Sequence, residues 1–560
     1  MSKQIKWYRM ENMLHCRVLR LRKHAYRRPK CSYKESDSDT AESDCSVIFQ
    51  KNAQWNGDLA LFILKQCLLS KILLFITQLF FNWILNDFPT DAFKGIVIKE
   101  KLSFVDHLIR FVFSGLTRWD SLHFLHIAQY GYSFENILAF FPLFPFLIYY
   151  FTLLWNWIIP FIHFSTALII SAIFINFVLF LICGQLLYAV SLTITKSSKT
   201  ALLACLVFTI NPASVFFASA YSEPLFMALT LSGLLVLYAH PNMPFIRHIG
   251  ASIFFAFAFL TRSNGIFNFI YILHQLFVET VYSSEKHKYI WQLKYTIILY
   301  KVIIIIFVHF LIVRFIIVGS FCWVILGSLL ISHDVQMKKL FCESNFVNKS
   351  AIPVEILDFA EQKNFVLPGE ISKISWCRLE FFYEYYPFWI PLPSFYAAVQ
   401  QKYWNVKSFG YWKLKKIPCF LMALPAVLIV FYGCYRELRR LARYSSSVVY
   451  AILYICRDSI SLLPFCCHSF ILAILSLILY NAEVATRILF SSSPYIYLVL
   501  SQYMHQRTPL VTLEDVQYPT LLPFFTNFCR THIIHALLLG YLLCYFFIGT
   551  LLHVNWLPFT

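Results

Sequence analysis

Apolar runs long enough to cross a lipid bilayer recur along most of this 560-residue sequence. A bilayer span needs about 20 predominantly apolar residues. Runs that meet or approach this length lie at 58–86, 137–159, 166–190, 200–218, 224–240, 249–279, 295–332, 417–434, 447–481, 487–504 and 532–556. Hydrophobic residues make up 59% of the chain, and a soluble domain could not bury them all. The sequence therefore predicts an all-α polytopic membrane protein with roughly 9 to 13 transmembrane helices.

The first 55 residues differ in composition from the membrane domain expected over 56–560. Basic residues cluster between Arg17 and Lys30, and an acidic, serine-rich stretch follows from Ser36 to Ser46. No apolar segment with a small-residue cleavage site follows promptly, so this is not a signal peptide. We interpret 1–55 as a disordered cytosolic tail, because cytosolic flanks of membrane helices collect Lys and Arg. The same bias accounts for the net charge of +18. No basic soluble module points to a nucleic-acid partner.

Two polar stretches, 87–136 and 333–416, are long enough to form structured loops. With a cytosolic N-terminus, the first should face the lumen. The second contains an N-glycosylation sequon at Asn348, with Cys342 and Cys377 on either side of it. A sequon within a pair of cysteines indicates an oxidising, lumenal face. We expect these cysteines to form a disulfide, the alternative being two buried free thiols.

A carboxylate and an imidazole lie close together in the first of these loops. At helical spacing Asp120 and His123 share a face, and Gly131 should end their helix. The pattern predicts a short amphipathic helix on the membrane surface. Asp120 would serve as a general base supported by His123, or the two residues would form a merely hydrated face. A metal site that includes His126 is a weaker alternative, because His126 lies roughly 120° from Asp120 around the helix.

Two more polar clusters interrupt the apolar runs. Asn211 and Glu223 lie between runs, next to Pro212 and Pro224. Irregular polar backbone at membrane depth is tolerated only where it is buried in protein or lines a cavity. Arg262 is flanked by apolar stretches on both sides. Its planar guanidinium suits a phosphate group, but a residue in a cytosolic loop explains it equally well.

Nucleotide- and zinc-binding motifs are missing from the sequence. It contains no phosphate-binding loop, no dinucleotide fingerprint and no HExxH motif. The 16 cysteines show no pair of CxxC motifs, so we expect no structural zinc. An ATP-driven pump is therefore disfavoured. An enzyme of this kind must take an activated donor that itself resides in the membrane.

Several strings, in order over residues 56–560, resemble the PIG-V family of GPI mannosyltransferases. They are Trp119-Asp120, His123-Phe124, Gly131-Tyr132, Glu135, Phe140-Phe141-Pro142, Asn211-Pro212-Ala213, Tyr221-Ser222-Glu223, Arg262-Ser263-Asn264-Gly265, Trp376-Cys377, Tyr403-Trp404-Asn405-Val406, Thr486-Arg487, Ser491-Ser492-Ser493-Pro494 and Leu552 to Thr560. The sequence departs from the family in its longer basic tail and in apparent extra residues around 312–333.

The resemblance implies a GT-C type glycosyltransferase of the endoplasmic reticulum membrane. Such an enzyme transfers the second mannose, in α-1,6 linkage, from dolichol-phosphate mannose to a mannosyl-glucosaminyl-(acyl)phosphatidylinositol acceptor. It needs no cofactor, and its active site is lumenal. A small accessory membrane subunit is compatible with the resemblance. The resemblance maps the catalytic carboxylate onto Asp120, with His123 orienting it. The implied substrate-binding residues are Glu135, Tyr221, Glu223, Arg262, Asn264, Asn405 and Arg487, with Arg262 or Arg487 stabilising the leaving phosphate.

Two other classes fit the same composition. A transporter or lipid scramblase would place buried charge pairs in mid-span and broken helices in two related halves. A membrane acyltransferase would use a histidine inside a span, for which His309 is the candidate. The accumulation of GPI precursors with a single mannose in cells lacking the protein would identify the transferase.

The tail should be dispensable for catalysis. Its composition cannot form an apolar core, and we expect it on the side of the membrane opposite to the chemistry. Deletion of residues 2–50 should leave surface display of GPI proteins intact when the variant is expressed in cells that lack the second GPI mannosyltransferase. A loss of display at normal protein level and location would contradict this prediction.

Overall fold

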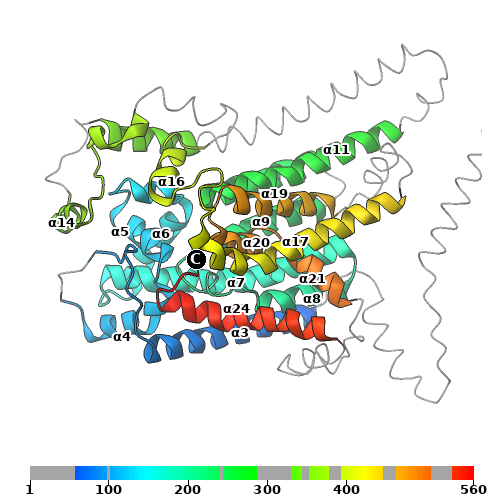
Figure 1. Cartoon of the computed structure of the whole chain (residues 1–560), viewed down its shortest axis with the longest axis horizontal. Helices are drawn as coiled ribbons and strands as arrows, with labels where there is room; N and C mark the ends of the chain where they lie inside the picture. The colour runs from blue at the N-terminus through cyan, green and yellow to red at the C-terminus, as the bar shows by residue number, and fades with distance from the viewer. Residues whose placement is uncertain are drawn as a thin grey trace, which may run out of the picture. The chain divides into compact units, whose positions relative to one another are not determined.

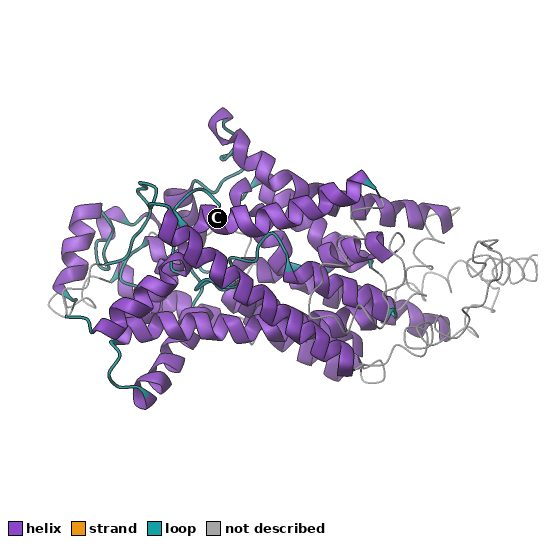
Figure 2. Cartoon of the chain, turned by 90° about the horizontal axis from the view of Figure 1, so that it is seen from below, coloured by secondary structure: helices purple, strands orange, loops and turns teal. Residues whose placement is uncertain are grey.

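The computed structural model describes residues 57–96, 101–239, 244–286, 329–343, 352–377, 392–444, 462–505 and 532–559. Throughout these ranges the regular elements are helices, and none is a strand (Figure 2). The tail over 1–55, the sequon at Asn348, His309 and most of the run 295–332 lie outside the described residues.

Four described helices are long and apolar enough to cross a membrane. They are α3 (Gly57–Ile84), α7 (Phe164–Thr195), α17 (Ile417–Tyr444) and α24 (Ile533–Val554). Five shorter apolar helices accompany them: α6 (Leu143–Ile158), α8 (Ser198–Thr209), α9 (Glu223–Ala239), α10 (Pro244–Thr261) and α19 (Leu463–Ile478). The all-helical membrane architecture is confirmed, whereas the expected total of spans stays a prediction.

The apolar helices pack into one bundle. Helix α9 packs against both α7 and α10, while α3 packs against α7 and α24 (Figure 1). Helix α21 (Tyr495–His505) lies against α8, and α11 (Phe269–Lys286) lies against α19. Helix α9 begins at Glu223 and Pro224. A carboxylate suits the positive end of a helix, and proline fits the first turn because its missing N–H needs no partner there.

Three predicted spans are interrupted in the structure. The run 200–218 is helical only as far as Thr209, and residues 210–222 form a buried, non-helical segment. The run 249–279 is divided into α10 and α11 by the 3₁₀ helix η3 (Ser263–Asn268). The run 487–504 is divided at Pro494 into α20 (Ala485–Ser492) and α21. Proline removes a backbone donor and clashes with the preceding turn, which explains the last division.

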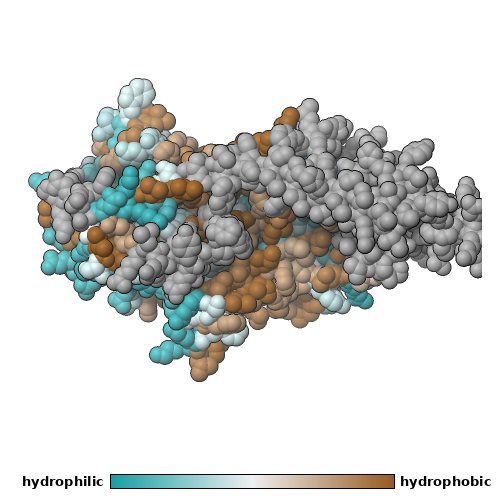
Figure 3. Space-filling model, turned by 90° about the horizontal axis from the view of Figure 1, so that it is seen from above, coloured by the Kyte–Doolittle hydropathy of each residue, from teal (hydrophilic) through white to brown (hydrophobic). Residues whose placement is uncertain are grey.

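Both predicted polar loops are folded where the structure describes them. The first contains α4 (Phe104–Phe113), η1 (Ser114–Leu116), α5 (Asp120–Tyr130) and η2 (Asn136–Ala139). The second contains a helix over 329–342, α14 (Val354–Lys363), η6 (Ile371–Lys373), η7 (Ser375–Cys377), α16 (Tyr396–Trp404) and η8 (Leu414–Lys416). Helices α4, α5, α14 and α16 lie at one end of the bundle (Figure 1). Hydrophilic residues gather at that end, and hydrophobic residues cover the visible bundle (Figure 3).

The roles of the two helices in the first loop differ from the prediction. Helix α5 ends at Gly131, as expected, and the φ of this glycine is 69°. However, its His123 and Phe124 are buried, so it does not lie on the membrane surface. The amphipathic surface helix is α4, which exposes Phe104 and Phe111. Two polar residues of α4 bond to the start of α7 instead: Asp106 accepts the His163 backbone N–H, and Arg110 donates to Ser165 and Thr166.

Glu135 fastens the two loops together. Its carboxylate is 0% exposed and accepts hydrogen bonds from the Trp376 indole (3.0 Å), the Tyr403 hydroxyl (2.7 Å) and the Lys402 ammonium. The disulfide expected between Cys342 and Cys377 is present beside this contact. Since both carboxylate oxygens have partners within the protein, Glu135 stabilises the loops. The substrate-binding role expected for it from the sequence stays a prediction.

Removal of the Glu135 carboxylate should destabilise the loops. Glu135→Ala leaves the buried Trp376 N–H without an acceptor and removes the partner of Lys402, which should lower the free energy of unfolding by about 2–4 kcal/mol. Glu135→Gln should recover part of this loss, because an amide oxygen still accepts a hydrogen bond. The thermal unfolding midpoint of the detergent-purified protein measures the effect.

Glu361→Ala provides the matched control, because Glu361 is exposed on α14. An unfolding midpoint for Glu135→Ala equal to that of this control would contradict a fastening role.

Candidate active site

The site is built around Asp120, in the first turn of α5. The residue before it, Trp119, has a left-handed backbone with φ 56° and provides no side-chain cap for the helix. The Asp120 carboxylate accepts a hydrogen bond from Arg487 Nη1 at 2.8 Å. Arg487 lies on α20, so this ion pair joins parts of the chain that are 367 positions apart.

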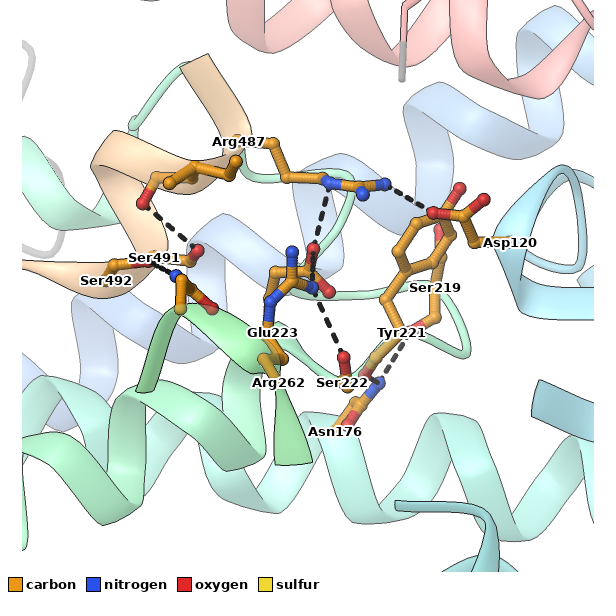
Figure 4. A network of polar contacts seen from close by, with 12 residues as sticks. Asp120, Asn176, Ser219, Tyr221, Ser222, Glu223, Arg262, Arg487, Ser491 and Ser492 are labelled. Atoms are coloured by element: carbon orange, nitrogen blue, oxygen red, sulfur yellow. Dashed lines mark hydrogen bonds and ion pairs between the residues drawn. The ribbon is translucent and has the colours of Figure 1, made fainter. Parts of the chain in front are cut away.

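Arg487 is shared between two carboxylates. Its Nε lies 3.0 Å from Oε1 of Glu223, at the start of α9. Arg262, in the break between α10 and η3, also pairs with Glu223 Oε1. The four residues form a continuous chain of alternating charge, Asp120–Arg487–Glu223–Arg262 (Figure 4). Two negative and two positive groups balance one another, so this chain is neutral as a unit.

The two carboxylates differ in accessibility. The Asp120 side chain is 26% exposed, whereas the Glu223 side chain is 0% exposed. An acceptor hydroxyl can therefore approach Asp120 but not Glu223. The exposed end of the chain is the place where chemistry on a bound molecule can occur.

The buried segment 210–222 packs against the charged chain of Asp120, Arg487, Glu223 and Arg262. Asn176, on α7, donates hydrogen bonds to the backbone carbonyls of Ser219 (2.6 Å) and Tyr221 (2.8 Å). The Arg487 guanidinium lies 5.4 Å from the centre of the Phe216 ring and 5.3 Å from that of Tyr221. Cation–π attraction to these rings helps to fix the guanidinium between its carboxylates. Tyr221 is itself 0% exposed, and its ring contacts the Arg487 guanidinium.

The charge of Arg487 controls the ionisation of Asp120. Burial is the largest single influence and raises the pKa of the Asp120 carboxyl, but the charge and hydrogen bond of Arg487, together with the charges of His123 and Arg262, bring this pKa below its ordinary value. Asp120 is consequently ionised at neutral pH and able to accept a proton.

His123 has different surroundings from those expected. Its ring stacks between Phe93 (4.6 Å between ring centres) and Phe140 (4.7 Å), and it is 8% exposed. Burial lowers the pKa of the His123 imidazole to about 4, against the opposing charge of Asp120. The ring is therefore neutral at pH 7. The hydrogen bond that holds Asp120 comes from Arg487, and His123 packs the base of α5.

The remaining predicted substrate residues lie outside the charged chain. Asn264 is buried and donates to the Ser492 hydroxyl at 2.7 Å, which links η3 to the end of α20. Asn405 ends α16 with a left-handed φ of 53° and donates to the Gly410 carbonyl at 3.0 Å. Both amides have structural partners that account for them.

A three-residue metal site is not assembled in the described part of the chain. His126 contacts the Ser133 hydroxyl at 2.6 Å, and no three described side chains with metal-binding groups gather around it or elsewhere. The alternative of a metal held by Asp120, His123 and His126 finds no geometric support.

Three contributors to the site were missed in the sequence. Asn176 lies in a long apolar helix, and a buried amide in such a helix was the available signal. Phe216 and His553 pack around the charged chain, but aromatic residues are too frequent in this sequence for either to stand out.

Comparison with known proteins identifies the family. The family model described as "Mannosyltransferase (PIG-V)" matches residues 60–560. The chain belongs to the PIG-V mannosyltransferase family. It is therefore a membrane glycosyltransferase, and the resemblance noted in the sequence is confirmed.

Individual PIG-V relatives match along most of their length. The GPI mannosyltransferase pigv-1 of Caenorhabditis elegans is 30% identical, with 94% of this chain and 84% of that protein covered. The GPI alpha-1,6-mannosyltransferase 2 of Homo sapiens is 26% identical, with 89% and 98% covered. The GPI mannosyltransferase 2 of Drosophila melanogaster is 27% identical, with 79% and 91% covered. All three are named as mannosyltransferases, so the transporter alternative has no support.

A solved structure also resembles this PIG-V chain weakly. It is the archaeal oligosaccharyltransferase AglB of Archaeoglobus fulgidus, in complex with an inhibitory peptide and a dolichol-phosphate. The TM-score is 0.36 at 10% identity, with 88% of this chain and 56% of that chain covered.

The ion pair with Arg487 should set the acidic limit of activity. Arg487→Gln removes the charge that holds the Asp120 pKa low, so burial then raises this pKa. A base works only when deprotonated, and the acidic limb of the rate–pH profile should move to higher pH. Arg487→Lys keeps the positive charge and should leave the limb near its original position, although it loses the planar geometry. Initial rates between pH 4 and 7 measure the shift.

If the acidic limb of the rate–pH profile lies at the same pH in Arg487→Gln and Arg487→Lys, the charge of residue 487 does not control the ionisation of Asp120. Protein level and unfolding midpoint must be matched, because Arg487 is buried and its loss leaves two carboxylates without their shared partner.

Proposed function

We propose that this PIG-V protein transfers the second mannose, in α-1,6 linkage, from dolichol-phosphate mannose to a mannosyl-glucosaminyl-(acyl)phosphatidylinositol acceptor. The family and the names of its relatives support GPI mannosyl transfer. The many apolar helices suit a donor and an acceptor that both carry lipid chains. The single observation that carries the assignment of the chemistry is that Asp120 forms the accessible end of a buried, neutral chain of charges.

The proposed transfer is an inverting displacement at the anomeric carbon of mannose. The Asp120 carboxylate takes the proton of the acceptor hydroxyl, and the hydroxyl oxygen forms a bond to the anomeric carbon of mannose. The bond between that carbon and the phosphate oxygen breaks, and its electron pair leaves with dolichyl phosphate. A positioned base contributes about 10²–10⁴-fold in rate to such a step.

The charged chain links proton transfer to stabilisation of the leaving group. When Asp120 accepts the proton, its negative charge is lost and the balance of the chain changes. Arg487, Glu223 and Arg262 then have a net charge of +1. This positive charge appears as negative charge grows on the departing phosphate, so the same residues serve as base and as electrostatic stabiliser.

The environment of the reaction belongs to the same proposal. We place the enzyme in the endoplasmic reticulum membrane, with the tail over 1–55 cytosolic and the loops 87–136 and 333–416 lumenal. The GT-C arrangement, with its catalytic carboxylate in the first lumenal loop, fits the position of Asp120. No cofactor is needed, because the donor is already activated. An accessory membrane subunit is compatible with the proposal.

Substitution of the base tests the assignment most directly. Asp120→Asn keeps the size of the side chain but removes the proton acceptor and the charge, so conversion of the one-mannose precursor should fall by about 10²–10⁴-fold. The measurement is product formation by membranes that contain the variant and labelled donor. Asp91→Asn is the matched control, because Asp91 is an exposed carboxylate of the same loop and its loss should change the rate little.

Near-normal conversion by Asp120→Asn at normal protein level would remove Asp120 as the base. Restoration of surface GPI proteins in cells lacking the second GPI mannosyltransferase tests the substrate assignment separately. Failure of the wild-type chain there would overturn that assignment.

A further inference from the structure

The end of α24 and the residues after it fold back onto the active-site end of the bundle. The chain reverses at Trp556, whose backbone is left-handed with φ 61°, and the Leu557 N–H closes the turn on the Leu552 carbonyl at 2.8 Å. Trp556 is 2% exposed and Phe559 is 7% exposed. We call residues 553–559 the closing segment. None of them was given a role in the proposed chemistry.

The closing segment holds the residues immediately before Asp120. The Trp556 ring packs against the Trp119 ring, with 5.4 Å between their centres. Arg118 donates from Nε to the Val554 carbonyl at 3.2 Å, and its guanidinium lies over the Trp556 ring. The Phe88 N–H donates to the Asn555 carbonyl at 3.0 Å. The polypeptide that leads into α5 is thus fixed by both side chains and backbone groups of the closing segment.

The closing segment also contacts residues that surround Arg487. Phe559 stacks on Phe216, with 5.8 Å between ring centres and 16° between planes. Phe216 also contacts the Arg487 guanidinium, which lies 5.4 Å from the centre of its ring. His553 contacts the Ser219 hydroxyl at 3.4 Å and packs edge-on against Phe216. The closing segment therefore contacts a neighbour of each member of the ion pair: Trp119, which precedes Asp120, and Phe216, which contacts Arg487.

Backbone strain marks the junction between the two tryptophans. A left-handed backbone is unfavourable for bulky residues, and it persists where the surrounding structure imposes it. Trp119 and Trp556 both have this conformation, and their rings touch. The conformation of Trp119 determines where α5 begins and hence where the Asp120 carboxylate points. Trp556 is placed to maintain it.

We propose that Trp556, with Phe559, is a positioning residue for the transfer reaction, which holds the Asp120 carboxylate against the Arg487 guanidinium. The inference rests on the proposed function of Asp120 as the base. It extends the active site to residues that do not contact the substrate.

A pH profile distinguishes positioning from general stabilisation. The charged and titratable groups that face Asp120 are Arg487 of α20, Tyr221 and Glu223 around the start of α9, Arg262 before η3, His123 of α5 and His553 of α24. Of these, Arg487 makes the direct hydrogen bond to the carboxylate. If the pair loosens, Asp120 becomes easier to protonate, and the acidic limb moves to higher pH.

The test uses the full chain, purified in detergent, with dolichol-phosphate mannose and the one-mannose acceptor. Trp556→Ala should lower kcat by about tenfold, because a small misplacement of a reacting group is costly. The KM for the donor should change by less than about twofold. The acidic limb should move upward, and Trp556→Phe should restore most of the turnover. Trp157→Ala is the matched control, since Trp157 lies at the end of α6 and is 81% exposed.

Normal kcat in Trp556→Ala would overturn the proposal, and so would a lowered kcat with an unmoved acidic limb. If Trp556→Ala does not accumulate, Phe559→Ala takes its place under the same criteria. The Asp120→Asn variant distinguishes failure of the proposed base from failure of the positioning role. Near-normal turnover by Asp120→Asn would show that Asp120 is not the base. If Asp120→Asn is inactive but Trp556→Ala has normal turnover, Asp120 stays the base and Trp556 has no positioning role.

Discussion

The shared guanidinium of Arg487 is the interaction on which the rest of the site depends. A buried charge is stable only when it is paired and hydrogen-bonded, and removal of one partner leaves the other at a large cost. Arg487 contacts Asp120 and Glu223 together, and Glu223 in turn contacts Arg262. These contacts require α5, α9, α10 and α20 to meet at one point. The end of the bundle is therefore organised around a charge balance as well as around apolar packing.

The breaks in the helices follow from the same requirement. A continuous helix through 200–240 would satisfy its own backbone but could not turn Glu223 towards Arg487. The chain instead leaves the helix at Thr209 and resumes it at Glu223. Non-helical backbone at this depth needs partners, and Asn176 and the Asn211 side chain provide them. The irregular segment is the means by which a carboxylate is placed at a helix start inside the protein.

The sequence predicted the membrane class, the end of α5 at Gly131 and each member of the charged chain, because glycine and charged residues stand out between apolar runs. Their pairing was not predictable, since Asp120 and Arg487 are 367 positions apart and no local pattern joins them. The burial of His123 between Phe93 and Phe140 was also not predicted, because helical spacing tells which residues share a face but not whether that face is buried. For the same reason, α5 was predicted to be the amphipathic surface helix, whereas α4 is the helix that exposes its apolar side chains.

The balance of charge also bears on why we propose Asp120 rather than Glu223 as the base. Both carboxylates contact the same guanidinium, so the difference lies in their other surroundings. Glu223 has a second arginine, Arg262, and no exposed surface, whereas Asp120 has one arginine and an accessible side. Glu223 contacts both Arg487 and Arg262, whereas Asp120 contacts Arg487 alone. In the proposed reaction, a proton taken up by Asp120 leaves Arg487 still paired with Glu223. The site would then gain a positive charge while keeping the contact that joins α9 and α20.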